Sequence, residues 1–176
     1  MDGALAEPRP IRYGGAVPET DAPEIRWPTG FMPGQADLDA ENEIFIDATG
    51  TTVWWHLVAA QKWPAWYPNS HELRIAGNRT GLLQADSRFD FFTFGLHIDA
   101  RMAEFVPESR LGWFGKGDGL ETFQRWHLVR VPKGCHVVTR WMAKGPRALA
   151  MGKRDPDAIR KGHDLWLRSL KAIAER

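Results

Sequence analysis

Four residues have side chains that could polarise a carbonyl group or move a proton: Tyr67, Gln124, Thr139 and His163. His163 lies on the apolar face of a C-terminal segment with helical spacing, where burial lowers the pKa of an imidazole and keeps it neutral. Such a group can accept or donate one proton. A histidine that only packs in the core is the alternative interpretation, and the same choice applies to Gln124 and Thr139.

Other reactive side chains form no recognisable catalytic or metal-binding pattern. His97 and Asp99 share one face of a predicted strand, but no third ligand follows at a recognisable spacing, which favours a solvated surface pair. Cys135 and His136 are neighbours in a strand and point to opposite faces, which disfavours a Cys–His nucleophile. The GKGDG stretch joins two strands and is typical of a hairpin turn. We expect no metal and no cofactor.

Composition narrows the classes of protein. The chain has 176 residues, is 43% hydrophobic and carries a net charge of +1, which favours one globular domain without an electrostatic attraction for nucleic acid. Its single cysteine, Cys135, excludes an intrachain disulfide and fits a reducing compartment. No segment approaches the length of a membrane span. We therefore expect a cytoplasmic protein that binds no nucleic acid and does not insert into a membrane.

The first regular elements follow a proline-rich start. Residues 1–40 contain half of the chain's 12 prolines and no amphipathic period, so they are predicted to form an extended arm. Its second half carries Trp27 and Phe31 and is expected to dock on the domain, whereas residues 1–20 have too few apolar side chains to require order. Residues 42–48 then alternate as in a half-buried strand.

Two short helices, more strands and one long helix follow. The spacing of apolar residues over 49–66, interrupted by Pro64, predicts two short helices. Turn clusters divide the chain between 68 and 146 into six strands, and residues 156–174 have the period of a long amphipathic helix. The order predicts an α+β fold in which a seven-stranded curved antiparallel sheet wraps around the C-terminal helix. The domain spans 41–176.

This order of elements, together with several motifs, resembles the SRPBCC superfamily, whose START-like or helix-grip fold includes polyketide cyclase/dehydratase and lipid-transport proteins. The resemblance covers residues 41–176. It is carried by NEIFIDA followed by VWWHL, by WPAWYPN, by FDFFTFGLHIDARMAEFVPESRLGWFG, by RWHLVRVPKGCHVVT and by the terminal HDLWLRSLKAIAE. Two positions depart from the family pattern: Gln124 replaces a frequent histidine, and Arg140 with Trp141 replaces a frequent acidic pair.

The resemblance implies an internal hydrophobic cavity between the sheet and the long helix, and strand alternation indicates which side chains face it. An inward wall rich in Phe and Trp favours flat, conjugated or polycyclic ligands. The predicted ligand-binding residues are Trp63, Trp66, Tyr67, Phe89, Phe91, Thr93, Met102, Trp113, Gln124, Trp126, Thr139, Trp141, His163, Trp166, Leu167 and Leu170. The alternative is that these rings simply fill the core.

The tryptophans of residues 54–66 divide by position. Trp54 lies on the apolar stripe of the first helix and is predicted to be core, whereas Trp55 is one step round the helix and is predicted to be at the rim or surface. Trp63 and Trp66 flank the helix break, where this fold closes the cavity mouth. They are expected either to pack or to touch the ligand.

The leading functional hypothesis is a protein that binds a hydrophobic, aromatic or polycyclic small molecule. The alternative is a cofactor-free polyketide cyclase or dehydratase in which Gln124, Thr139, Tyr67 or His163 acts on a carbonyl or a proton. A chaperone-partner module that binds protein is a third class. The changed family positions favour binding without catalysis, and the sequence leaves the oligomeric state open, a homodimer included.

Overall fold

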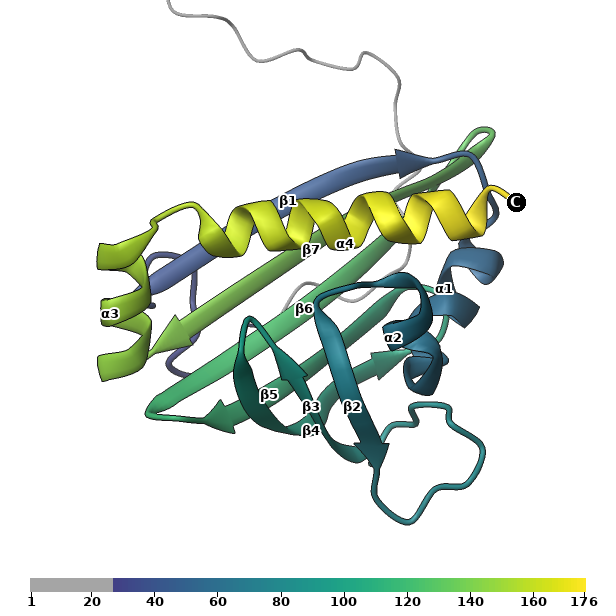
Figure 1. Ribbon diagram of the computed structural model, residues 1–176. Coiled ribbons are helices and arrows are strands. Elements are labelled where there is room, and N and C mark those ends of the chain that lie inside the picture. Colours follow the sequence, from purple (N-terminus) through teal and green to yellow (C-terminus); the bar gives the residue numbers. More distant parts are fainter. Residues whose placement is uncertain (1–26) are drawn as a thin grey trace, which may run out of the picture.

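A computed structural model of the chain describes residues 27–176, and the prediction for residues 1–20 lies outside the described residues. Seven antiparallel strands form one open sheet in the order β1-β7-β6-β5-β4-β3-β2, with the long helix α4 across one face (Figure 1). The strands are β1 (Leu38–Ile46), β2 (Ser70–Ile75), β3 (Arg88–Thr93), β4 (Leu96–Val106), β5 (Arg110–Gly117), β6 (Leu120–Val131) and β7 (Gly134–Lys144). The helices are α1 (Gly50–Val58), the 3-10 helix η1 (Ala60–Lys62), α2 (Trp63–Trp66), α3 (Pro146–Arg154) and α4 (Ala158–Ala174). The predicted α+β helix-grip class is confirmed.

Local signals explain how the helices begin. The Thr49 hydroxyl accepts a hydrogen bond from the backbone N–H of Thr52 and caps α1. Pro64 lies in the first turn of α2, where its missing N–H has no helical partner to lose. Helix α4 buries one stripe against the sheet, at Ile159, His163, Trp166, Leu167, Leu170 and Ala174.

The start of β1 and the presence of helix α3 differ from the sequence-based expectation. Strand β1 begins at Leu38, so the last three residues of the predicted arm already pair with β7. Helix α3 was not predicted, because it is short and buries only Ala148, so few apolar contacts mark it in the sequence. Pro146 occupies the first turn of this helix, where its missing N–H has no helical partner to lose.

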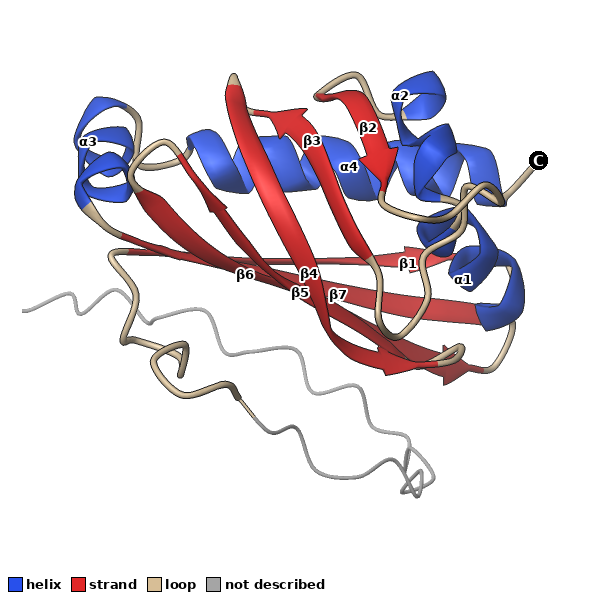
Figure 2. Ribbon diagram, turned by 90° about the horizontal axis from the view of Figure 1, so that it is seen from below, coloured by secondary structure: helices blue, strands red, loops and turns tan. Residues whose placement is uncertain are grey.

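The sheet has two faces with different coverings. The concave face packs against α4, α1 and α2, while residues 27–37 lie across the opposite, convex face (Figure 2). On the convex side the buried ring of Phe31 packs against Phe114 and Phe123, at centroid distances of 6.0 and 6.1 Å. Met142 completes this convex cluster.

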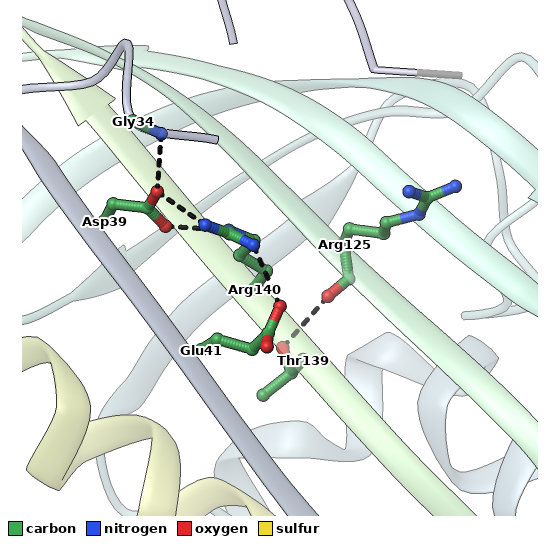
Figure 3. A network of polar contacts seen from close by, with 6 residues as sticks. All are labelled: Gly34, Asp39, Glu41, Arg125, Thr139 and Arg140. Carbon is green, nitrogen blue, oxygen red and sulfur yellow. Dashed lines mark hydrogen bonds and ion pairs between the residues drawn. The ribbon is translucent and has the colours of Figure 1, made fainter. Parts of the chain in front are cut away.

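Charged side chains surround the convex cluster. The Arg140 guanidinium forms ion pairs with Asp39 and Glu41 across the β1–β7 pair (Figure 3). These hydrogen bonds raise the pKa of Arg140 above its ordinary value, so the residue stays charged. The Trp27 ring lies 4.8 Å from the guanidinium carbon of Arg125 and 5.3 Å from that of Arg140. The first described residue is thus held by two cation–π contacts.

No helix within residues 27–176 combines the length and the apolar character needed to cross a lipid bilayer.

Candidate functional site

The interior between the sheet and α4 contains one small enclosed void of about 10 Å³. A polycyclic ligand needs hundreds of cubic ångströms, whereas this space holds about one water molecule. Aromatic side chains therefore fill most of the predicted cavity in this conformation. The lining residues are Phe91, Thr93, Phe94, Leu96, Ile98, Trp113, Thr122, Gln124, Trp141, His163 and Trp166.

Trp166 of α4 is the centre of the aromatic packing. Its ring stacks on Tyr67 at 4.3 Å with an interplanar angle of 9°, and it meets Trp63 and Trp126 edge-on at 5.2 and 4.9 Å. Edge-to-face and offset geometries are those that aromatic quadrupoles favour. The indole N–H of Trp63 donates to the Leu57 carbonyl, 3.0 Å away. The Trp166 indole N–H has no acceptor among the described residues.

His163 is the most strongly perturbed titratable group near the void. It is 1% exposed, and burial lowers the pKa of its imidazole to about 3. Its Nδ1 atom has no hydrogen-bond partner within residues 27–176. The rings of Phe94 and Trp141 lie edge-on at 5.9 and 6.2 Å. At neutral pH the imidazole is uncharged, and one polar edge is unsatisfied.

Gln124 and Thr139 face each other from neighbouring strands. The Gln124 amide donates to the Thr139 hydroxyl at 2.5 Å. That hydroxyl donates to the Arg125 carbonyl at 3.0 Å (Figure 3). Both side chains are buried. The Thr139 hydroxyl already accepts one hydrogen bond and donates one, so a ligand could add only a further donor to its oxygen.

Tyr67 connects α2 to α4 at the edge of the same cluster. The Asn69 amide donates to its hydroxyl at 3.0 Å, and the hydroxyl lies 3.4 Å from the Gly162 carbonyl. Burial raises the pKa of Tyr67 to about 12, although the Asn69 hydrogen bond opposes that rise. The phenol is therefore a neutral donor and acceptor.

Phe94 closes the end of the void that lies near the surface. It occupies the β3–β4 turn with a positive φ of 53°, followed by Gly95 at 71°. The Phe94 ring packs so closely on α4 that a Cβ at Gly162 would collide with it. Trp141 lies beside it, with ring centroids 6.5 Å apart. Phe94 is half-buried, whereas the other residues that line the void, Trp141 included, are buried.

The predicted site residues thus fall into three groups. Seven line the void: Phe91, Thr93, Trp113, Gln124, Trp141, His163 and Trp166. Eight others are buried in the surrounding core, namely Trp63, Tyr67, Phe89, Met102, Trp126, Thr139, Leu167 and Leu170. Trp66 is half-buried and lines a groove on the outer surface of the domain. The sequence analysis did not predict Phe94 as a lining residue, because Phe94 and Gly95 were interpreted only as one of the turns between strands.

The remaining reactive residues lie apart from this interior. His97 and Asp99 lie on the outward face of β4, where Asp99 is exposed and the Nε2 atom of His97 lies 3.0 Å from an Asp90 carboxylate oxygen on the adjacent strand. Within residues 27–176 no group of three or more His, Cys, Asp or Glu side chains is arranged to hold a metal ion. Burial raises the pKa of the Cys135 thiol to about 11, which makes it a poor nucleophile.

Known proteins resemble this chain in structure more than in sequence. Neither a family model nor a curated protein matches the sequence. Among solved structures, a hypothetical protein from Helicobacter pylori is 30% identical, with a TM-score of 0.79 over 86% of this chain and 96% of that chain. A START superfamily protein from Mycobacterium smegmatis has a TM-score of 0.59 at 12% identity, covering 78% of this chain and 97% of that one.

This chain has the START-like helix-grip fold. The same fold occurs in the Zhui aromatase/cyclase from Streptomyces sp. R1128, with 12% identity and a TM-score of 0.65 over 78% of this chain and 93% of that chain. Similarity at that level of identity establishes the architecture of this protein. Its ligand and chemistry must be argued from its own residues.

Proposed function

We propose that this helix-grip domain binds a small planar aromatic molecule between the sheet and α4, with access past Phe94 and Trp141. One observation carries the proposal: two buried nitrogen atoms beside the void, Trp166 Nε1 and His163 Nδ1, have no partner within residues 27–176. An unsatisfied buried polar group costs about 1–3 kcal/mol. A ligand with an oxygen acceptor recovers part of that cost by accepting from Trp166.

The surrounding wall supports an aromatic rather than an aliphatic body. Trp113 and Phe91 line the void, and Trp166 extends the aromatic surface on the α4 side. Flat ligands can stack on such rings or meet them edge-on. No charged side chain lines the void, so a neutral ligand, or one whose charge stays at the mouth, fits this interior best.

Binding requires the interior to open. A volume of about 10 Å³ must grow to the size of an aromatic ring, and the residues able to move are those at the solvent end. Phe94 is half-buried at the tip of a hairpin, where its ring contacts His163 and Trp141 and its backbone N–H donates to the Asn69 amide oxygen at 3.0 Å. Displacing one ring at a turn disturbs less packing than displacing a strand residue.

Binding without turnover is better supported than a cyclase or dehydratase. A general acid or base works best with a pKa near the working pH, but the pKa of His163 is about 3 and that of Tyr67 about 12. Gln124 and Thr139 hydrogen-bond to each other. A ligand that raised the pKa of His163 towards neutrality would favour the enzymatic alternative.

The test combines ligand discovery with matched variants. Native mass spectrometry followed by solvent extraction identifies co-purified aromatic molecules, and quenching of tryptophan fluorescence measures their affinity. Trp166→Phe removes the N–H donor but keeps a ring, and it should weaken binding about fivefold to tenfold, the value of one hydrogen bond in a buried site. Phe94→Ala should accelerate association, whereas Phe92→Ala, from the outward face of the preceding strand β3, should not.

Two results would contradict the proposal. The first is the absence of any saturable quenching across a panel of planar aromatic compounds. The second is a ligand whose affinity is the same for the wild type and Trp166→Phe, because the unsatisfied indole nitrogen would then play no part in binding.

A further inference from the structure

A larger groove lies on the outer surface of the domain, away from the interior void. It is a groove of about 750 Å³ between α1, α2 and the last turns of α4. Figure 1 shows these two short helices beside the C-terminal end of α4. The groove shares no lining residue with the interior void. Its size falls within the range of small-molecule sites.

The walls of the groove are apolar and aromatic. Trp55 is 55% exposed, although its neighbour Trp54 is 5% exposed and belongs to the core. One step along the helix turns the Trp55 ring outward, so that a large apolar surface faces solvent. Trp66 is half-buried on the opposite side, and Leu82 and Ile173 add aliphatic surface. Exposed apolar area of this kind is typical of a binding site.

The charged side chains that line the groove are all positive. Lys62 and Arg176 line it, whereas no aspartate or glutamate does. Neither cation forms an ion pair with a side chain of residues 27–176, whereas nearby Glu175 is engaged by Lys171. His56 also lines the groove, and its pKa is lowered by burial and by the charge of Lys62. The side chains that line the groove therefore carry a net positive charge.

We propose that this groove binds a small amphipathic anion, with a planar apolar body between Trp55 and Trp66 and an anionic group beside Lys62. The aromatic walls suit the body, and the unpaired ammonium group suits a carboxylate. A concave groove encloses a discrete molecule, whereas a bilayer surface is flat. This inference does not depend on the interior binding site proposed above.

The probe is 2-naphthoate, compared with uncharged 2-naphthylmethanol. Titrations are followed by ¹⁵N NMR of the tryptophan indole N–H signals, assigned with single Trp→Phe variants. The signals of Trp55 and Trp66 should move saturably, and naphthoate should bind more tightly than the alcohol. Lys62→Gln should weaken naphthoate binding about threefold to fivefold and remove that preference. Lys153→Gln, which changes an exposed lysine of α3, is the charge-matched control.

A second variant tests the apolar wall. Trp55→Ala removes an exposed ring and should weaken binding of both probes about tenfold without loss of folding. The proposal is overturned if the Trp55 and Trp66 signals stay still up to the solubility limit, or if Lys62→Gln leaves naphthoate affinity unchanged. Changes confined to the indole N–H signals of Trp113 and Trp166 would overturn the proposal for the groove while supporting the interior site. The two proposals can therefore fail separately.

Discussion

The two faces of the sheet bury aromatic rings next to different neighbours. On the concave face Trp113 and Trp126 point towards α4, and the void beside Trp113 has no charged lining residue. On the convex face Phe114 and Phe123 pack under Phe31, with the Arg101 guanidinium and the Lys144 ammonium group close by. The same strands supply both sets, because alternate residues of a strand point to opposite faces.

The difference lies in which face holds charged groups. Arg110 and Arg125 are nearly buried on the convex face and share the carboxylate of Glu104, which is about a quarter exposed. Both faces leave some buried polar atoms without a partner within residues 27–176: Nε and Nη1 of Arg125 on the convex face, and Trp166 Nε1 and His163 Nδ1 on the concave face. Only on the concave face do these atoms belong to neutral groups beside a void without charged lining residues.

The largest effect should come from the centre of the concave face. Trp166→Ala removes the ring that contacts Tyr67, Trp63 and Trp126, and we expect a loss of about 3–5 kcal/mol in the free energy of unfolding. Urea denaturation measures it. Trp55→Ala, which removes an exposed ring, should cost less than about 0.5 kcal/mol. Equal losses in the two variants would refute the view that the concave cluster is the stabilising core.

The convex cluster should contribute less. Phe31→Ala leaves the rings of Phe114 and Phe123 uncovered and should lower the free energy of unfolding by about 2.5 kcal/mol. Its neighbour Met32 is 51% exposed, so Met32→Ala serves as the control with little expected change. If Phe31→Ala is as mild as Met32→Ala, the covering segment does not stabilise the sheet.

The pH dependence of the free energy of unfolding tests whether His163 is buried as a neutral group on the concave face. The pKa of His163 falls from 6.5 to about 3 on folding, so only the unfolded chain takes up this proton between these values. Stability is therefore full above pH 6.5 and falls as the pH decreases towards 3. Between pH 7 and 5 the wild type should lose about 2 kcal/mol more than His163→Leu. Parallel pH profiles of the two proteins would show that His163 is not buried as a neutral group.

The smallest effect concerns the edge of the convex face. Trp27→Ala removes two cation–π contacts, with Arg125 and Arg140, and should cost about 1 kcal/mol. Trp27→Phe should recover part of this loss, because a smaller ring keeps a weaker quadrupole. Thermal unfolding of both variants measures the difference, and a Phe variant no better than Ala would argue against the cation–π contribution.

Much of this architecture could be predicted from the sequence because it depends on local patterns. Alternation placed Phe89, Trp113 and Trp126 on the inner face, and all three are buried. The helical step separated Trp54 from Trp55, which are respectively buried and exposed. Helix α3 escaped prediction because a helix of nine residues that buries one alanine is too short a pattern to stand out.

The sequence by itself determined the strand order along the chain, the inward set of side chains and the membership of the helix-grip fold, since each follows from residue spacing and motifs. Only the tertiary structure decided how those side chains share the interior. Whether rings enclose a cavity or fill it depends on distances between elements far apart in the chain, such as Phe94 resting on Gly162. The pairing of His97 with Asp90 and the groove beside Lys62 likewise result from register and packing, which no local pattern encodes.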